Sequence, residues 1–301
     1  MADLEVRELR YFRVVAQEGS LSRAAERLGM AQPPLSRAIG RLERRLGVRL
    51  LDRDNRGVRL TPAGTTLLEE SARVMDAVSA AAHRTRRAAL DEPTLVVTGK
   101  PGVASGLLAR IVAAYRTRPD AARVEIVVSG YGEQADLVRS GQVDLALVGS
   151  PQHDPAGLDT EPLVSEPRVA ALSVNHPLAV RATLLLADLA EYPMPLWRDA
   201  TPDELDFWTG RDRMPTDQPI TGPVIQDTSQ LVEVVVLGQA VALLPQSAVE
   251  SNQRSDVVFR PVLDASPYLT SVAWAAGARS RWIAGFVRTA SELTNSVSRI
   301  A

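Results

Sequence analysis

The chain has 301 residues, of which 45% are hydrophobic and 23% are charged, and it contains no cysteine. This length allows two or three domains, and the composition is that of a globular chain, not of a disordered or membrane-spanning one. The absence of cysteine excludes disulfides, iron–sulfur clusters, cysteine nucleophiles and thiolate zinc sites.

The net charge of −2 hides an asymmetry along the chain. Residues 1–90 carry 17 arginines and 11 acidic residues, whereas the remaining 211 residues carry 17 basic and 25 acidic residues. A basic N-terminal part suggests contact with a polyanion, although a salt-bridged, solvated surface explains the same excess.

The start of the chain and the histidines bear on location and cofactors. Residues 1–10 mix both signs of charge without the layout of a secretory signal, so we expect a cytoplasmic protein. His83, His153 and His176 are far apart in sequence and lack the spacing of metal ligands. We expect no cofactor and no metal.

Three short helices are predicted first. An apolar stripe of Leu9, Phe12 and Val15 indicates a helix over residues 4–16. Ser20 is a suitable N-cap for a second helix over residues 21–28, and Gly29 suits its C-terminal end.

Pro33 and Pro34 mark the start of a third helix that runs to about Leu46. Its outer face is polar and cationic, and it follows the second helix after a short turn. Such a pair is typical of the helix-turn-helix, which places the N-terminal end of its second helix in the major groove. Base-edge contacts are expected from Gln32, Ser36 and Arg37, and phosphate contacts from flanking arginines such as Arg41.

A hairpin is predicted next, with strands near Val48–Leu50 and Val58–Leu60 around a polar turn. Arg53 and Arg56 lie near the tip of this wing, where they can reach the minor groove or phosphates. A hairpin with solvated charges explains either arginine equally well.

Thr61 and Pro62 then predict the cap and first turn of a long helix that runs to about Leu90. Apolar positions recur at spacings of four and three residues with one polar gap, as in a coiled coil. The seam consists of Leu67, Ser71, Val74, Val78 and Ala81. We expect it to pair two chains, and a helix packed on its own chain is the alternative.

From Thr94 onward, strands and helices alternate in a βαβ pattern that predicts a parallel sheet. The expected elements are strands 95–98, 124–128 and 144–148 with helices 103–116 and 133–140. A second unit from about Pro167 has strands 169–174, 193–197 and 241–244 and a helix over 229–237, before strand 270–275 and helix 279–294.

Ligands of such sheets collect at the carboxyl ends of the strands, in the crevice where two lobes meet. The residues expected there, including one beside a helix N-terminus, are Lys100, Gly102, Val103, Gly130, Tyr131, Arg198, Asp199 and Thr228. A cationic side chain and a helix N-terminus suit an anionic ligand such as a carboxylate.

The first sixty residues strongly resemble the LysR-type transcriptional regulators. The runs that carry the resemblance are Leu-Arg-Tyr-Phe from Leu9, Gly-Ser-Leu-Ser-Arg-Ala-Ala from Gly19, Ala-Gln-Pro-Pro-Leu-Ser-Arg from Ala31 and Leu-Thr-Pro-Ala-Gly from Leu60. The resemblance implies that Gln32, Pro33, Ser36 and Arg37 approach DNA, with Arg53 from the wing; Pro34 belongs to the same turn. The family commonly has Ser or Thr at the position of Ala31, whose methyl group cannot cap a helix.

The expected architecture is therefore mixed: a mainly α winged helix-turn-helix over residues 1–61, a linker and dimerisation helix over 62–91, and a two-lobed α/β effector domain over 92–301. Lobe I covers about 92–165 and 269–301, and lobe II about 166–268. The resemblance implies a regulator, not an enzyme, that binds double-stranded DNA at an imperfect palindrome near a promoter. It also implies a small-molecule effector, a homodimer or homotetramer, and a contact with RNA polymerase.

Two other classes of function were weighed. A solute-binding protein does not explain the N-terminal helices. An enzyme is the second class, and none of the common catalytic motifs occurs in the structural context that it requires. A different winged-helix family fits the βαβ region less well.

Overall fold

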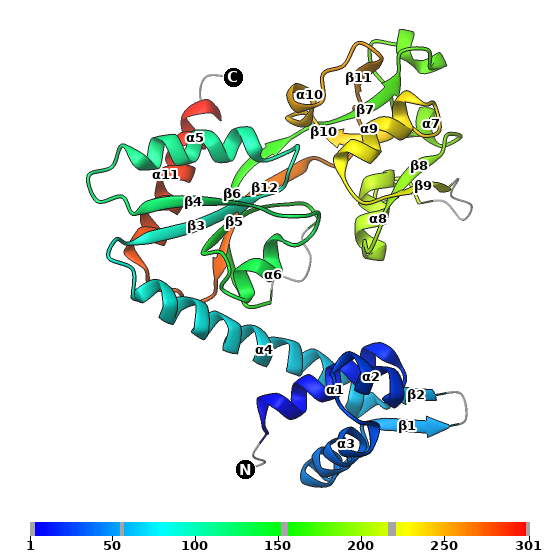
Figure 1. The fold of residues 1–301 in the computed structure, drawn as a ribbon. Coiled ribbons are helices and arrows are strands. Elements are labelled where there is room, and N and C mark those ends of the chain that lie inside the picture. The colour runs from blue at the N-terminus through cyan, green and yellow to red at the C-terminus, as the bar shows by residue number, and fades with distance from the viewer. Residues whose placement is uncertain (1–3, 55–56, 152–155, 216–220, 299–301) are drawn as a thin grey trace. The chain divides into compact units, whose positions relative to one another are not determined.

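The computed structural model describes residues 4–54, 57–151, 156–215 and 221–298. The chain divides into two compact units, Met1–Thr85 and Arg86–Ala301 (Figure 1). The first is helical with one hairpin and the second is α/β, as predicted.

The first unit begins with the three expected helices, α1 (Val6–Glu18), α2 (Leu21–Arg27) and α3 (Gln32–Leu46). The Ser20 hydroxyl caps α2 by accepting a hydrogen bond from the Arg23 N–H, and Gly19 ends α1 in the left-handed conformation. The apolar stripes meet in one core that contains Phe12, Leu35 and Ile39. An ion pair between the buried Glu8 and the exposed Arg45, at 2.9 Å, ties α1 to α3.

The wing consists of the antiparallel strands β1 (Leu51–Asp54) and β2 (Gly57–Leu60). The first strand was predicted too early, at residues 48–50. The Leu50 N–H donates to the Glu43 carboxylate instead of a partner strand, because Leu50 is drawn into the core below the hairpin. Arg53 therefore lies within a strand, opposite Val58, and not at the tip.

The long helix α4 (Pro62–Ala88) begins at the predicted cap, where the Gly64 N–H donates to the Thr61 hydroxyl at 3.0 Å. Gly64 is required because a side chain there would meet the Leu50 carbonyl. At the other end of α4, the Arg87 guanidinium forms an ion pair with Asp144 at 3.0 Å within the second unit.

Lobe I is a five-stranded sheet with the order β4-β3-β5-β12-β6. Its strands are β3 (Thr94–Gly99), β4 (Arg123–Val128), β5 (Leu145–Gly149), β6 (Leu158–Glu166) and β12 (Tyr268–Ala275). The first three are parallel as predicted, whereas β12 runs antiparallel to both β5 and β6.

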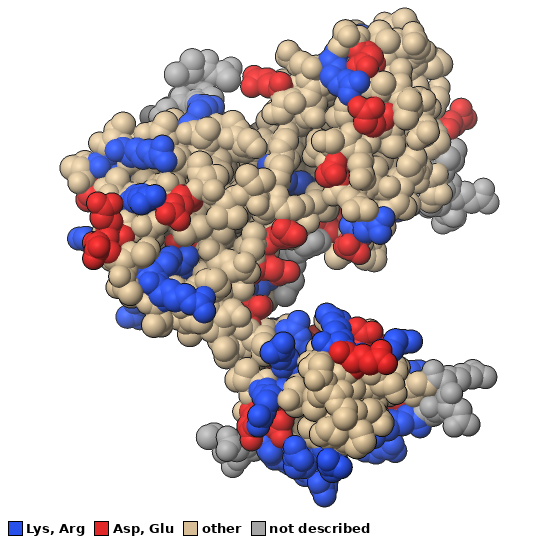
Figure 2. All heavy atoms as spheres, in the orientation of Figure 1, with Lys and Arg blue, Asp and Glu red and all other residues tan. Residues whose placement is uncertain are grey.

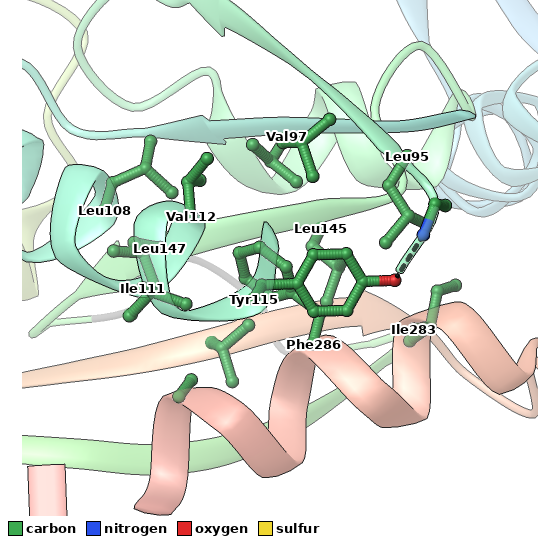
Figure 3. Close-up of a cluster of buried hydrophobic side chains, with 14 of the residues drawn as sticks. Leu95, Val97, Leu108, Ile111, Val112, Tyr115, Leu145, Leu147, Ile283 and Phe286 are labelled. Carbon is green, nitrogen blue, oxygen red and sulfur yellow. Dashed lines mark hydrogen bonds between the residues drawn. The ribbon is translucent and has the colours of Figure 1, made fainter. Parts of the chain in front are cut away.

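Helices α5 (Ser105–Arg116) and α11 (Arg281–Ser298) cover one face of this sheet, and α6 (Gln134–Arg139) covers the other. Figure 3 shows the core below the helix pair, where the Tyr115 ring packs on Phe286 and its hydroxyl accepts a hydrogen bond from the Ala122 N–H. Helix α5 begins two residues later than predicted, which leaves Val103 in the preceding turn.

Lobe II contains a three-stranded antiparallel sheet and a two-stranded parallel sheet. The strands are β7 (Arg168–Ser173), β8 (Met194–Trp197), β9 (Thr221–Ile225), β10 (Ala242–Pro245) and β11 (Val257–Pro261). The helices are η1 (Pro177–Val180), α7 (Leu186–Leu189), α8 (Pro202–Thr209), α9 (Thr228–Val236) and α10 (Ala248–Ser251). Strands β6, β9 and β11 were not predicted, because each contains a proline in a short polar or irregular pattern.

Candidate DNA interface and effector pocket

The residues predicted to read DNA lie together at the N-terminal end of α3. Gln32, Pro33 and Arg37 are exposed there, and Ser36 is half-buried. Pro34 is half-buried in the first turn, and Arg41 is exposed one turn further along. The inner face of the helix is fixed by the core, so these outward side chains have one orientation relative to the domain.

The wing and the recognition helix are linked by side chains. The Arg53 guanidinium donates to the Ser36 hydroxyl at 3.1 Å and lies 3.9 Å from the Glu43 carboxylate. Glu43 in turn accepts from the Leu50 and Leu51 N–H groups. The link keeps Arg53 beside the residues predicted to read bases. Arg56, predicted at the tip, lies outside the described residues.

Basic side chains gather on the first unit, whereas the second unit shows both signs on the face drawn in Figure 2. Arg37, Arg41 and Arg44 are all exposed along α3. Such a surface attracts phosphates without selecting a sequence.

An open pocket lies at the carboxyl ends of β3, β4 and β5 in the second unit. Most of its wall comes from lobe I, and Glu204 on α8 closes it from lobe II. The polar residues that line it are Lys100, Tyr131, Gln134, Thr160 and Glu204. The apolar wall includes Ala135, Val148, Leu158 and Ala273.

Four aromatic rings from both lobes form a cage around the Lys100 ammonium. The nitrogen lies 4.4 Å from the ring centroid of Tyr131, 4.5 Å from that of Trp208, 5.8 Å from that of Tyr268 and 6.0 Å from that of Trp197. Tyr131 stacks on Trp197 with centroids 4.0 Å apart, which joins lobe I to lobe II. We call these four residues the aromatic cage. The rings attract a cation through their electron-rich faces.

Burial lowers the pKa of Lys100 to about 7, and the nearby Glu204 carboxylate partly opposes this shift. Burial also raises the pKa of the Tyr131 and Tyr268 hydroxyls, so both stay protonated. The pocket therefore contains an amine that gains or loses its charge near neutral pH.

Two polar atoms in the aromatic cage lack a hydrogen-bond partner among the described residues, namely the Tyr131 hydroxyl and the Trp208 indole nitrogen. The Trp208 N–H is near enough to the Tyr131 hydroxyl to lower its pKa, but the two groups do not have the geometry of a hydrogen bond. A buried donor without a partner costs free energy, which a ligand that accepts a hydrogen bond would recover.

Helix α8, which carries Glu204 and Trp208, is anchored by a fully buried arginine at the start of β7. The Arg168 guanidinium donates one hydrogen bond to the Phe207 carbonyl on α8. It donates another to the Ser266 carbonyl, at 2.6 Å. Burial lowers the pKa of Arg168 to about 10, and Asp212 at 3.6 Å partly restores it. These contacts fix the position of α8 and, with it, the side of the pocket that lobe II supplies.

The remaining predicted effector residues are not among the described residues that line this pocket. Gly102 faces Thr228, since a Cβ at Gly102 would lie 3.2 Å from the Thr228 side chain. Val103 packs against the lobe II core. The exposed Gly130 donates its N–H to Glu133.

Arg198 and Asp199 follow β8 and are exposed, and Asp199 has a φ of 62°. The Gln226 amide oxygen, in its hydrogen-bonded orientation, accepts from the Arg198 guanidinium at 2.9 Å. Thr228 is the first residue of α9, and the N-cap is Asp227, one residue earlier than the prediction implied.

Sequence reasoning missed Glu204, Gln134 and Thr160 as pocket residues. Glu204 had a readable signal, because Thr201 and Glu204 form a capping box that marks the start of α8. Gln134 and Thr160 had none. Gln134 reaches the pocket from a six-residue helix, and Thr160 lies on the unpredicted strand β6.

Within the described ranges, no group of three or more His, Asp or Glu side chains could hold a metal ion. No helix in those ranges combines the length and the apolarity that crossing a membrane requires.

Both units match one family of known proteins. Residues 6–65 match the bacterial regulatory helix-turn-helix proteins of the LysR family, and residues 88–294 match the LysR substrate binding domain. The chain therefore belongs to the LysR family of transcriptional regulators, as its motifs predicted.

Curated relatives and solved structures extend over nearly the whole chain. The Hca operon transcriptional activator HcaR of Escherichia coli is 29% identical, with 98% of this chain and 100% of HcaR covered. The regulator BudR of Raoultella terrigena is 30% identical, with 94% and 99% covered. A crystal structure of full-length CbnR with its target DNA is 25% identical with a TM-score of 0.53, covering 96% of this chain and 99% of CbnR. These relatives are regulators, not enzymes, which agrees with the prediction.

Proposed function

We propose that this chain is a cytoplasmic, homodimeric or homotetrameric regulator that binds an imperfect palindrome near a promoter and responds to an anionic effector. Binding of the effector at the pocket changes how the bound oligomer bends DNA or contacts RNA polymerase. The assignment of residues 1–61, 62–91 and 92–301 to DNA binding, dimerisation and effector binding belongs to this proposal.

The observation that supports an anionic effector is the set of donors at the pocket and in the aromatic cage beside it. Lys100 and Tyr131 line the pocket, and Trp208 belongs to the cage. Lys100 supplies a cation, and the Tyr131 hydroxyl and the Trp208 N–H have no partner among the described residues. A carboxylate accepts from all three kinds of group and pairs with the ammonium. Arg198 and the N-terminus of α9 lie at the same edge of lobe II as further candidates.

The DNA-reading part rests on α3 and the wing. Gln32, Ser36 and Arg37 are assigned to base edges, and Arg41 and Arg53 to phosphates or the minor groove, by the family resemblance and their exposure. The exposed Val74 and Val78 on α4 supply the apolar seam for a second copy.

The experiment has two parts. Genome-wide binding on fragmented host DNA, followed by footprinting at a stated salt concentration, should give a protected imperfect palindrome beside a promoter. A panel of small carboxylates should then raise the melting temperature of the wild-type chain but not of Lys100→Met. Arg110→Met, which removes an exposed cation from α5, is the matched control.

Binding without a preferred site would contradict the regulator proposal. Equal stabilisation of wild type and Lys100→Met by every carboxylate that binds would remove Lys100 from the effector site.

A further inference from the structure

We propose that the pocket senses 2-oxo acids and related carbonyl compounds by forming a reversible imine between their carbonyl carbon and the Lys100 amine. The inference rests on the proposed function of this pocket as the effector site and names the class of effector that it takes.

The first observation is the position of the amine. Lys100 lines the pocket, and its nitrogen is surrounded by the aromatic cage at 4.4–6.0 Å from the ring centroids. It is also the sole lysine of the sequence. The rings and the burial of the nitrogen reduce its contact with water, and an imine persists where water that would hydrolyse it is scarce.

The second observation is the state of the amine. The groups that face it are the Glu204 carboxylate on α8, the Tyr131 hydroxyl after β4 and the Tyr268 hydroxyl on β12. Because its pKa is lowered to about 7, Lys100 is a neutral nucleophile at neutral pH far more often than an exposed lysine is. An exposed lysine is neutral in only roughly one molecule in 2,500 under the same conditions. Desolvation of this kind is how proteins activate lysine for imine chemistry.

The reaction uses only groups in the pocket. The nitrogen lone pair attacks the carbonyl carbon, the C–N bond forms, and the carbonyl oxygen takes up the proton that the nitrogen loses, which gives a carbinolamine. The proton that the Lys100 ammonium released to the Glu204 carboxylate before the attack then reaches the hydroxyl, the C–O bond breaks and water leaves. The nitrogen retains its remaining proton and forms the C=N bond. Overall, an ammonium and a carbonyl give an iminium and one water, with no oxidation or reduction.

The remaining donors specify the rest of the ligand. The Tyr131 hydroxyl and the Trp208 N–H have no partner among the described residues and suit the carboxylate oxygens of an oxo acid. The Glu204 carboxylate also lines the pocket and repels a second negative group. A 2-oxo acid with one carboxylate and an apolar body fits this arrangement.

The test is reductive trapping with glyoxylate, the smallest oxo acid, and sodium cyanoborohydride at pH 7. Peptide mapping by mass spectrometry should find the reduced adduct on Lys100, with the N-terminal amine as an internal reference. The control is the double variant Lys100→Arg/Arg110→Lys. It also has a single lysine, but that lysine is exposed on α5. We expect Lys100 to react at least about tenfold faster than the control lysine, because far more of it is neutral. Circular dichroism confirms that both chains are folded.

An adduct rate at Lys100 no higher than in the control would overturn the imine. Glycolate has the same carboxylate but a hydroxyl in place of the aldehyde carbonyl, so it cannot form an imine. It therefore distinguishes the anion site from the imine. If glycolate raises the melting temperature of wild type but not of Lys100→Met, while glyoxylate is not trapped, the anion site stands and the imine fails. Trapping at Lys100 without stabilisation by glycolate supports the imine and removes the simple anion site.

Discussion

Lys100 carries its charge only part of the time, since burial lowers its pKa to about 7. A bound carboxylate favours the ammonium and therefore raises this pKa in the complex. Carboxylate affinity should then be constant below pH 7 and fall by roughly tenfold per pH unit above it. Isothermal titration in buffers of different ionisation enthalpy should also show proton uptake at pH 7.

The matched variant for this prediction is Lys100→Arg, because its guanidinium stays charged across the range. It should bind the same carboxylate with an affinity that does not change between pH 6 and about pH 9. A flat profile for wild type would mean that Lys100 does not pair with the anion.

Arg37 is an exposed cation at the N-terminal end of α3, where a side chain can reach a guanine edge. Arg37→Ala should weaken specific binding by about 1–3 kcal/mol and relax the preference at one base position. Fluorescence anisotropy on the footprinted site and on single-base variants measures both effects. Arg84→Ala, on α4, is the control and should leave base preference unchanged. Equal specific binding by Arg37→Ala at matched salt would remove Arg37 from base reading.

At the scale of elements, α3 begins without a side-chain cap. Its N-cap residue is Ala31, in an extended conformation that suits a serine, and no side chain bonds to the first turn there. Ala31→Ser should stabilise the first unit by about 1 kcal/mol, since a hydroxyl would accept from a free N–H of that turn. Thermal unfolding followed by circular dichroism measures the change. Ala31→Val, which adds volume without a useful acceptor, should give no such gain, and an equal shift in both variants would argue against capping.

Helix α4 exposes two apolar residues of the predicted seam, Val74 at 39% and Val78 at 43%. Ser71 and Ala80 are buried within the chain, so this helix packs partly on its own chain and partly presents a stripe for a partner. Val78→Asp should shift sedimentation toward monomer, because a carboxylate in a coiled-coil seam must be desolvated. Ala77→Asp, one position away on an exposed surface, is the control. An unchanged assembly in Val78→Asp would place the dimer contact elsewhere.

Helices and strands were predicted well where a single periodic apolar face packs against a single core. Helices α1 to α4 and strands β3 to β5 have clear stripes and strong caps, and their bounds were predicted to within about three residues. The wing strand β1 was misplaced because Leu51 is its only apolar residue, and one apolar position gives no alternating pattern that would set the register. Strand β6 failed for a similar reason, since most of its residues are exposed and Pro162 interrupts it.

At the scale of the whole molecule, the rule that ligands collect at the carboxyl ends of parallel strands selected Lys100 and Tyr131, and both line one pocket in the structure. Their role in effector binding stays a prediction. The rule could not supply Glu204, Trp197 or Trp208, because these approach from lobe II, and sequence spacing does not encode how two lobes meet. The aromatic cage around the amine is a property of the folded second unit alone.

The charge asymmetry of the chain leads to a last prediction. Seventeen arginines against eleven acidic residues in residues 1–90 imply that binding to DNA releases counterions. Raising the salt concentration from about 50 to about 200 mM should lower DNA affinity by roughly 10³-fold or more for a dimer that makes six or more phosphate contacts. Carboxylate binding at the half-buried Lys100 should change by less than about threefold, because salt screens buried pairs weakly. Anisotropy on the operator and calorimetry on the ligand, in the same buffers, make the comparison. A parallel loss of both affinities would mean that the effector pairs with exposed cations, which would favour Arg198 over Lys100 as its partner.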